Sequence, residues 1–520
     1  RDVLLKDELV RALQMRRFEW DGKLHSLSTN AIEQIVRELS TPGLNEGLLT
    51  ANERIYDKLS FGVTVKEFIG GKPVQPTIPI IDWENPENNL FHVTEEMEVL
   101  SAAGTHKRIP DIVCFVNGIP LVVIEAKRPE SGNPNKSMLE EGISQSIRNQ
   151  KNDEIPHLFA YAQLLIAISN TDGRYATTMT PKKFWSKWRE EELKEQVFHE
   201  IKNKPLSPEA ADAIFAERPA KMRRYFESLW VKPVVPTDQD KLLISLLSKE
   251  RLLETIQYFI LFDKKVGKIV ARYQQAFGIK AMLRRVKSLD KLGSREGGVI
   301  WHTTGSGKSF TMVFLSKALL LDPALRDCRV FIVTDRVDLE KQLSRVFLSG
   351  GAFGSVMATK KDGEKSKARS GRDLAYRIGK GTERIIFTII DKFSTASKLP
   401  ECYNPSDKII VLVDEGHRSH GGETHERMRK ALPNAAYIAF TGTPLLKDDK
   451  TQNKFGPIIH AYTMQRAVED GTVTPLLYEE RRPDLDVNET AIDNWFDKIT
   501  AKLSEKQKTD LKKKFANKGA

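Results

Sequence analysis

Two carboxylates and one lysine interrupt an otherwise apolar stretch of sequence between residues 109 and 127. Asp111 lies near the start of the first apolar run, and Glu125 and Lys127 lie at the end of the second. Burying charged side chains without partners is costly, so we expect these three to have a use. Two carboxylates can hold Mg2+, which polarises a phosphate ester, and a nearby lysine can orient water or stabilise developing charge. We therefore predict Asp111 and Glu125 as metal ligands and all three as catalytic residues.

The turn between the two runs decides whether these side chains can meet. Asn117 and Gly118 separate the runs, and Asn-Gly is a strong signal for a β-hairpin. A regular two-residue turn would pair Asp111 with Ile124 and place Glu125 on the opposite face. An odd-numbered loop, such as a three-residue turn with Gly118 left-handed in a bulge, would place all three on one face. We expect the odd loop; the alternative is a surface hairpin with one salt-bridged edge.

A second candidate site is a glycine-rich loop between a strand-like run at 298–302 and a helical run at 310–321. Glycines let the backbone curl so that its N–H groups face phosphate, and the helix adds its positive N-terminus. Lys308 would reach the β- and γ-phosphates, and Ser309 would place its hydroxyl on Mg2+. His302 occupies the first glycine position of the strict pattern, so the match is to a shortened form. The expected nucleotide-binding residues are Thr304, Gly305, Ser306, Gly307, Lys308 and Ser309.

Two further polar motifs follow apolar, strand-like runs downstream. The run at 409–413 leads into Asp414 and Glu415, which could hold Mg2+ and position an attacking water, respectively. The run at 436–440 leads into Thr-Gly-Thr-Pro at 441–444. Motifs at the carboxyl ends of parallel strands meet at one edge of a sheet. The three motifs together predict ATP binding with Mg2+, the metal being held by Ser309 and Asp414.

These motifs resemble motifs I, II and III of superfamily 2 helicases and translocases, with Gly416 in the place of the usual alanine of motif II. Residues 333–336 resemble motif Ia, which touches the nucleic-acid backbone. Residues 272–275 resemble the upstream adenine-reading segment, and Gln275 is the expected contact. The coupling residues that the resemblance implies are His417, Thr441 and Thr443.

The hairpin residues resemble the PD-(D/E)xK motif of a nuclease family, which has Pro-Asp followed by Glu-x-Lys. A nuclease of this kind ahead of a superfamily 2 motor lobe resembles the restriction (R) subunit of type I restriction-modification enzymes, over roughly residues 45–475. The resemblance implies a cytoplasmic ATP-dependent DNA translocase and Mg2+-dependent endonuclease that works with methyltransferase (M) and specificity (S) subunits. Such an enzyme cleaves unmodified double-stranded DNA away from its recognition site.

Two other interpretations stay open from the sequence. The chain could be another helicase–nuclease fusion, such as a type III-like restriction subunit or a stand-alone defence enzyme, although those usually carry the nuclease after the motor. It could also be a DNA-stimulated ATPase whose nuclease-like domain only binds DNA. Weaker site candidates are Glu53, as an extra acidic residue, and Gln145, where related nucleases have Gln-x-x-x-Tyr and this chain has Asn149 instead of Tyr.

The elements that must position these residues predict an α/β protein. We expect a mixed α/β nuclease-like domain at 1–180, a helical connector at 181–260 and a RecA-like lobe with a parallel sheet at 261–475. Residues 476–520 would begin a second lobe or form a linker. Only 76 residues follow Pro444, so we expect a chain truncated after its first lobe, which binds ATP but turns it over weakly.

Composition adds limits to this reading. The 520 residues carry 81 Lys and Arg against 70 Asp and Glu, and two segments, 360–384 and 501–520, each hold a net charge of +5 out of +11. Clustered basic residues can contact DNA phosphates, and the alternative is a solvated surface. Three widely spaced cysteines argue against a disulfide framework or a zinc site. Without an apolar run near 18 residues, we expect no membrane segment.

Overall fold

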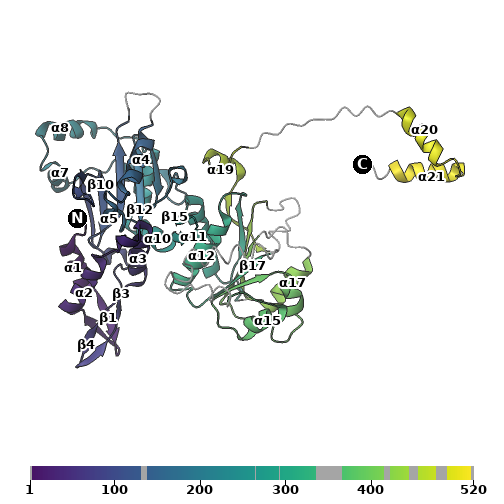
Figure 1. Ribbon diagram of the computed structural model, residues 1–520, viewed down its shortest axis with the longest axis horizontal. Helices are drawn as coiled ribbons and strands as arrows, with labels where there is room; N and C mark the ends of the chain where they lie inside the picture. The colour runs from purple at the N-terminus through teal and green to yellow at the C-terminus, as the bar shows by residue number, and fades with distance from the viewer. Residues whose placement is uncertain are drawn as a thin grey trace. The chain divides into compact units, whose positions relative to one another are not determined.

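The computed structural model describes residues 3–129, 137–263, 265–291, 293–334, 366–414, 422–443, 455–475 and 489–516. The chain separates into two compact units, Arg1–Val473 and Thr474–Ala520. The first unit contains both predicted sites, each built on its own β-sheet (Figure 1). The second unit contains the helices α20 (Glu489–Ile499) and α21 (Glu505–Ala516).

The first sheet has five strands in the order β13-β12-β11-β10-β7 among the described residues. Its strands are β7 (Phe91–Glu95), β10 (Ile112–Val116), β11 (Ile119–Lys127), β12 (Leu164–Ser169) and β13 (Asp172–Ala176). Strands β11 and β12 are parallel, and the other neighbours are antiparallel. The central strands are apolar and buried on both faces, because helices and loops cover both sides.

Helices and short strands surround this sheet. The helices are α1 (Lys6–Met15), α2 (Thr29–Leu39), α3 (Leu48–Phe61), α4 (Met138–Asn149) and α5 (Pro156–Phe159), with 3-10 turns at Leu44–Glu46, Pro86–Asn88 and Lys182–Phe184. The short strands are β1 (Arg17–Trp20), β2 (Lys23–Ser26), β3 (Val63–Thr64), β4 (Glu67–Ile69), β5 (Lys72–Val74), β6 (Thr77–Ile78), β8 (Val99–Leu100) and β9 (Lys107–Arg108). Helix α4, which supports the first site, is capped by Ser137, whose side chain accepts a hydrogen bond from Glu140 N.

A helical stretch links the two sheets. Its helices are α6 (Glu195–Lys202), α7 (Pro208–Phe215), α8 (Ala220–Leu229), α9 (Asp238–Leu246) and α10 (Lys249–Tyr258). The hairpin of β14 (Ile260–Asp263) and β15 (Gly267–Val270) follows. Thr237 and Asp240 form a capping box that fixes the start of α9.

The second sheet has six strands in the order β18-β17-β19-β20-β16-β21 within the described part of the chain, and all neighbours are parallel. Its strands are β16 (Gly298–His302), β17 (Arg329–Thr334), β18 (Ile385–Ile389), β19 (Ile409–Asp414), β20 (Ala436–Thr441) and β21 (Ile458–Tyr462). The helices around it are α11 (Tyr273–Lys287), α12 (Lys308–Leu321), α15 (Gly371–Lys380), α16 (Lys392–Ala396), α17 (Gly422–Ala431) and α19 (Met464–Glu469). The predicted α/β class and parallel sheet are confirmed.

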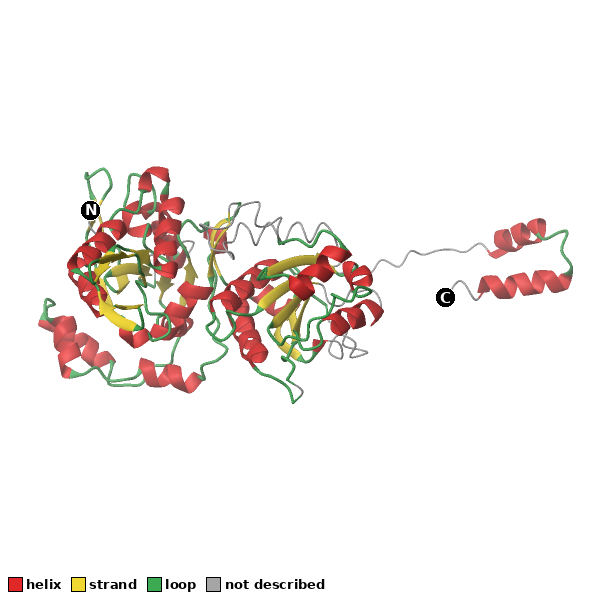
Figure 2. Cartoon of the chain, turned by 90° about the horizontal axis from the view of Figure 1, so that it is seen from below, coloured by secondary structure: helices red, strands yellow, loops and turns green. Residues whose placement is uncertain are grey.

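Alternating residues of these strands fill two separate cores. On β19, Val411 belongs to the cluster that includes Leu374 and Phe393, whereas Leu412 belongs to the other cluster. Figure 2 shows helices on both sides of these strands. Burial on both faces explains why the strands read as continuous apolar runs in the sequence. No described helix is long and apolar enough to cross a membrane.

Candidate functional site

The hairpin that carries the first site turns through two residues. Val116 pairs with Ile119, so the loop consists of Asn117 and Gly118, with φ angles of 51° and 75°. Positive φ at both positions is the type I′ geometry that favours Asn-Gly. A Cβ on Gly118 would also lie 2.3 Å from the Leu5 carbonyl oxygen, so only glycine fits here. The predicted left-handed Gly118 is present, but the predicted odd-numbered loop is wrong.

A β-bulge supplies the change of register that the loop does not. Phe115 pairs with Pro120, whereas Cys114 pairs with Val122, which leaves Leu121 as an extra residue on β11. Beyond the bulge Ile112 pairs with Ile124, which places Asp111 opposite Glu125. One inserted residue reverses the facing of every later side chain on its strand. The bulge therefore gives the shared face that we had expected from the turn.

The structure brings Asp111, Glu125 and Lys127 into contact. The Lys127 ammonium donates to Asp111 Oδ2 at 2.9 Å and to Glu125 Oε2 at 3.3 Å, and it lies 3.5 Å from the Ala126 carbonyl oxygen. The Ala126 amide also donates to Asp111 Oδ2 at 2.7 Å. Three oxygens thus converge on one positive charge.

Helix α4 holds Glu125 from the other side. Gln145 Nε2 donates to Glu125 Oε2 at 2.7 Å, and Asn149 Nδ2 donates to Glu125 Oε1 at 3.4 Å. Gly142 lets the helix approach, since a Cβ there would lie 3.3 Å from Lys127 Cγ. We had set Asn149 aside because it replaces a tyrosine. Its spacing of four residues from Gln145, which puts both on one helix face, is the signal that could have identified it. Glu53 lies on α3, and its role stays a prediction.

Burial and charge together set the protonation of this cluster. The Glu125 side chain has no solvent exposure, and its burial, followed by the neighbouring Asp111 carboxylate, raises the pKa of Glu125 to about 8. For Lys127, burial opposes the charged form, but hydrogen bonding to Asp111 and the two carboxylate charges outweigh it and raise the pKa. Two like charges held this close favour a cation between them.

The oxygen set fits a hard divalent cation. Asp111 and Glu125 offer carboxylate oxygens and Ala126 a carbonyl oxygen, which are the donors that Mg2+ prefers, with water completing its shell. No group of three His, Cys, Asp or Glu side chains suited to a metal occurs in the described ranges. A cation held here would therefore rely on two carboxylates, the main chain and water.

The second site lies at the carboxyl edge of the parallel sheet. Strand β16 ends at His302 and helix α12 begins at Lys308, with Gly305 and Gly307 between them at φ angles of 85° and 92°. Both angles lie in the left-handed region that favours glycine. The loop between β16 and α12 thus has the strand–loop–helix form of a phosphate-binding loop.

The other motifs lie on the neighbouring strands, as predicted. In the sheet β19, β20 and β16 are adjacent, so Asp414 and Thr441 end strands beside the phosphate-binding loop. A Cβ on Gly442 would lie 2.7 Å from Thr304 Oγ1 and 3.3 Å from Lys308 Nζ, so this glycine permits close contact with the loop. The residues Glu415, Gly416, His417, Asp335, Arg336 and Pro444 lie outside the described residues.

Gln275 holds the phosphate-binding loop in this structure. Its Nε2 donates to the Gly307 carbonyl and to Thr311 Oγ1, both at 3.2 Å, and its Oε1 accepts from Arg272 N at 2.9 Å. These contacts link α11 to the start of α12. The adenine contact that we expected from Gln275 stays a prediction.

The basic segment at 360–384 is partly neutralised by its own fold. Arg377 is nearly buried and pairs with Asp373 at 3.0 Å and Glu383 at 2.9 Å. Residues 360–365 lie outside the described residues. Contact between this segment and DNA stays a prediction.

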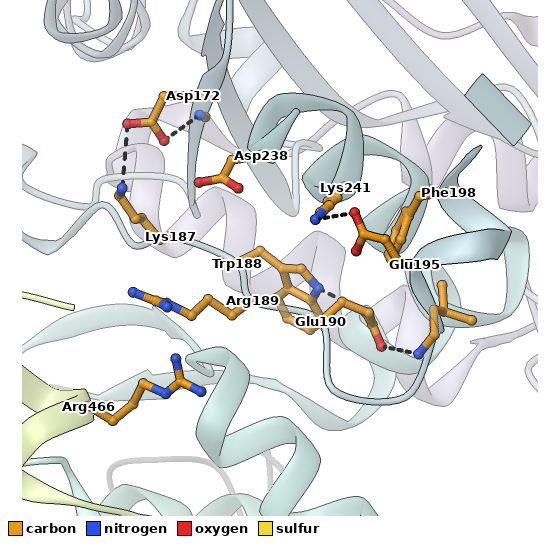
Figure 3. A pocket seen from close by; sticks show the side chains of 12 residues that line it. Asp172, Lys187, Trp188, Arg189, Glu190, Glu195, Phe198, Asp238, Lys241 and Arg466 are labelled. Atoms are coloured by element: carbon orange, nitrogen blue, oxygen red, sulfur yellow. Dashed lines mark hydrogen bonds and ion pairs between the residues drawn. The ribbon is translucent and has the colours of Figure 1, made fainter. Parts of the chain in front are cut away.

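A cavity of about 310 Å3 opens beside residues 187–190 (Figure 3). Its charged side chains include two ion pairs, Lys187 with Asp172 at 3.7 Å and Lys241 with Glu195 at 2.7 Å. None of the predicted site residues lines it.

Two protein families match different parts of this chain, and each match covers one of the two sites. Residues 1–184 match the family described as type I restriction enzyme R protein N terminus, and residues 274–509 match the SWI2/SNF2 ATPase family. The first family covers Asp111, Glu125 and Lys127, and the second covers the phosphate-binding loop.

Two curated relatives align with almost the whole chain. The type I restriction enzyme HindI endonuclease subunit of Haemophilus influenzae is 32% identical over 511 residues, which cover 94% of this chain and 44% of that protein. The putative type I restriction enzyme MjaIXP endonuclease subunit of Methanocaldococcus jannaschii is 31% identical over 529 residues, covering 99% and 46%. The chain thus spans less than half the length of these relatives. Among solved structures, the UvsW helicase of bacteriophage T4 aligns with 57% of this chain and 99% of its own at 14% identity and a TM-score of 0.29.

Proposed function

We propose that this chain, whose residues 1–184 match the type I restriction enzyme R protein N terminus and whose residues 274–509 match the SWI2/SNF2 ATPases, is part of a restriction endonuclease driven by ATP. The substrate would be unmodified double-stranded DNA, which the motor moves and the nuclease cleaves away from the recognition site. The partners would be methyltransferase and specificity subunits, and the setting the cytoplasm.

The bulge at Leu121 is the observation that carries the nuclease proposal. It brings Asp111, Glu125 and Lys127 onto one face, where sequence register alone would have separated them. Asp111 and Glu125 would hold Mg2+, which supplies polarisation of the scissile phosphate when bound. Lys127 would then stabilise negative charge or orient the attacking water. Gln145 and Asn149 would keep the Glu125 carboxylate in place.

Three aligned strand ends support the ATPase proposal. Residues 304–309 would hold the phosphates, with Lys308 on the β- and γ-phosphates and Ser309 with Asp414 on Mg2+. By resemblance, Glu415 would position the attacking water, and His417, Thr441 and Thr443 would couple hydrolysis to movement along DNA. Gln275 would meet adenine only by exchanging its contacts with Gly307 and Thr311.

The test uses the intact protein with its methyltransferase and specificity subunits on circular, unmethylated DNA. Lys308→Ala should abolish both ATP turnover and cleavage. Asp111→Ala and Glu125→Ala should abolish cleavage and keep ATP turnover. Glu98→Ala is the matched control, because Glu98 is an exposed glutamate that pairs with Lys107. Cleavage that survives both Asp111→Ala and Glu125→Ala would instead favour an ATPase whose nuclease-like domain only binds DNA.

A further inference from the structure

A short acidic segment ties the first part of the chain to the ATPase. Residues 188–192, which we call the strap, include three consecutive glutamates that contact different elements. Glu190 pairs with Arg251 of α10 at 3.3 Å. Glu192 pairs with Lys280 and Arg284 of α11, both at 2.7 Å. Figure 3 shows Trp188, Arg189 and Glu190 of the strap along the cavity, near Arg466 of α19.

The middle glutamate leads into the phosphate-binding loop through two histidines. Glu191 Oε2 lies 2.8 Å from Nε2 of His460 on β21. Nδ1 of His460 in turn lies 2.9 Å from Nε2 of His302, which is fully buried at the end of β16. His302 is the residue that replaces the first glycine of the strict phosphate-loop pattern. Glu191, His460 and His302 therefore form a continuous hydrogen-bonded relay.

The chemistry of the three groups gives the relay a direction. The Glu191 carboxylate can only accept, so His460 donates from Nε2 and its Nδ1 is left as an acceptor. His302 then donates from Nε2, and its own Nδ1 is a buried atom without a hydrogen-bond partner in the described structure. Burial, followed by the neighbouring His460 and Lys308, holds the pKa of His302 well below its usual value, so this imidazole stays neutral. One tautomer of each histidine thus satisfies the whole relay.

Helix α11 packs directly on the two histidines of the relay. Gly278 lies inside α11, where glycine is a poor helix former. A Cβ at this position would lie 3.4 Å from His302 Nε2 and 3.5 Å from His460 Nδ1. These are ordinary contact distances, so the main chain of α11 packs closely against both imidazole rings. The main chain also fixes the loop, because Thr303 N donates to the Tyr462 carbonyl at 2.9 Å.

We propose that Glu191 and His460 are positioning residues for ATP binding, which hold His302 and with it the phosphate-binding loop in place from the strap. This inference rests on the proposed ATPase function. His302 lies six residues before Lys308, where the loop begins. A shift of its imidazole would therefore move the peptide groups of the loop that face the phosphates. The strap begins four residues after the match to the R protein N terminus ends, and its Trp188 packs edge-on against Tyr175 of that part, so the relay links that part to the nucleotide site.

Titration of the intact protein with a fluorescent ATP analogue tests the relay. Glu191→Ala and His460→Ala should raise the Kd for the analogue about fivefold or more, a size usual for coupling between sites. Glu191→Gln keeps an acceptor oxygen for His460 and should stay within about twofold of wild type. His302→Gln, which can still donate to His460, should bind more tightly than His302→Ala.

Glu192→Ala is the matched control, because this neighbour on the strap pairs with Arg251, Lys280 and Arg284 and its loss leaves the bond between Glu191 and His460 in place. It should lower the midpoint of thermal unfolding and leave the Kd within about twofold. An equal rise in Kd for Glu191→Ala and Glu192→Ala would overturn the relay, as would an unchanged Kd for Glu191→Ala. Binding by wild type that Lys308→Ala does not weaken would instead overturn the proposed ATPase site.

Discussion

The environment of Glu125 indicates most clearly what this site can bind. It is a fully buried carboxylate beside a second one, and a lysine on its own strand and two amides on α4 hold it. An isolated buried carboxyl group would take its neutral form, whereas the hydrogen-bond donors around Glu125 can also stabilise its charged form. The cluster therefore suits a group that changes its protonation when a cation arrives.

We expect apparent Mg2+ affinity in the cleavage reaction to rise with pH up to about 8. The pKa of Glu125 is raised to about 8, so below this pH the metal must displace a proton from the carboxyl group. Above it the carboxylate is already ionised and the affinity levels off. The half-saturating Mg2+ concentration for DNA cleavage, measured between about pH 6 and 9, checks this. A half-saturating concentration that is constant over the range contradicts the assignment of Glu125 as a ligand.

Gln145→Ala should lower the cleavage rate about 10-fold or more, with ATP turnover unchanged. Its amide makes the shorter of the two hydrogen bonds from α4 to Glu125, and partners that orient a metal ligand commonly contribute this much. Asn149→Ala should have a smaller effect, because its contact is 3.4 Å long. Ser144→Ala is the control, since the Ser144 hydroxyl donates to the Glu140 carbonyl of its own helix. Equal rates for all three variants would exclude this role for Gln145.

At the scale of elements, the turn and the bulge show what a sequence does and does not disclose. The Asn117-Gly118 turn follows from local backbone preference and could be predicted. The bulge at Leu121 could not, because residues 119–124 are all apolar and buried, so no polar residue marks which side chains face which way. The parallel sheet was predictable from its buried strand runs. The Gln275 contacts depend on how α11 packs, which a motif does not specify.

Deleting Val113 should abolish cleavage and leave ATP binding intact. With one residue fewer on β10 and the bulge kept, the pairing beyond the bulge shifts by one, and Asp111 faces Ile124 instead of Glu125. Val113→Ala is the matched control, because it keeps the chain length and the register at the same buried position. Cleavage of plasmid DNA and binding of the fluorescent ATP analogue measure the two functions. Cleavage at the wild-type rate by the deletion variant would show that the register does not form the site.

At the scale of the whole first unit, helix α3 joins the two sheets. Asn52 donates to the carbonyl groups of Phe159 at 2.9 Å and Ala162 at 2.8 Å, beside the first sheet. Four residues later, the Tyr56 hydroxyl accepts from Lys317 of α12, the helix that follows the phosphate-binding loop. Lys317 also donates to the Ile260 carbonyl at 2.7 Å. The burial of Lys317 could not be predicted from the sequence, because a lysine in a helix is ordinarily solvated.

Tyr56→Phe should lower the free energy of unfolding by about 1–3 kcal/mol, because it removes a buried hydrogen-bond partner.

Burial lowers the pKa of Lys317 to about 7, so the folded chain favours the neutral amine. This lysine therefore makes the folded chain more stable as pH rises from about 7 towards 10, where the unfolded side chain loses its proton. Lys317→Met should remove that contribution, and chemical unfolding of both variants across this pH range checks it. An identical pH dependence in Lys317→Met and wild type would contradict this view.

One apolar cluster extends from Leu165 of the first sheet through Ile256 of α10 to Phe277 and Met312 beside the second sheet. Because one apolar cluster joins the two sheets, the halves of the chain that carry them cannot be exchanged freely between related proteins. A chimaera joined anywhere between residues 180 and 260 would set two unmatched halves of this cluster against each other, and mismatched cores lose packing. We therefore expect recombinants that inherit both halves from one parent to accumulate as soluble protein, and hybrids to require compensating changes on α3, α10 and α12.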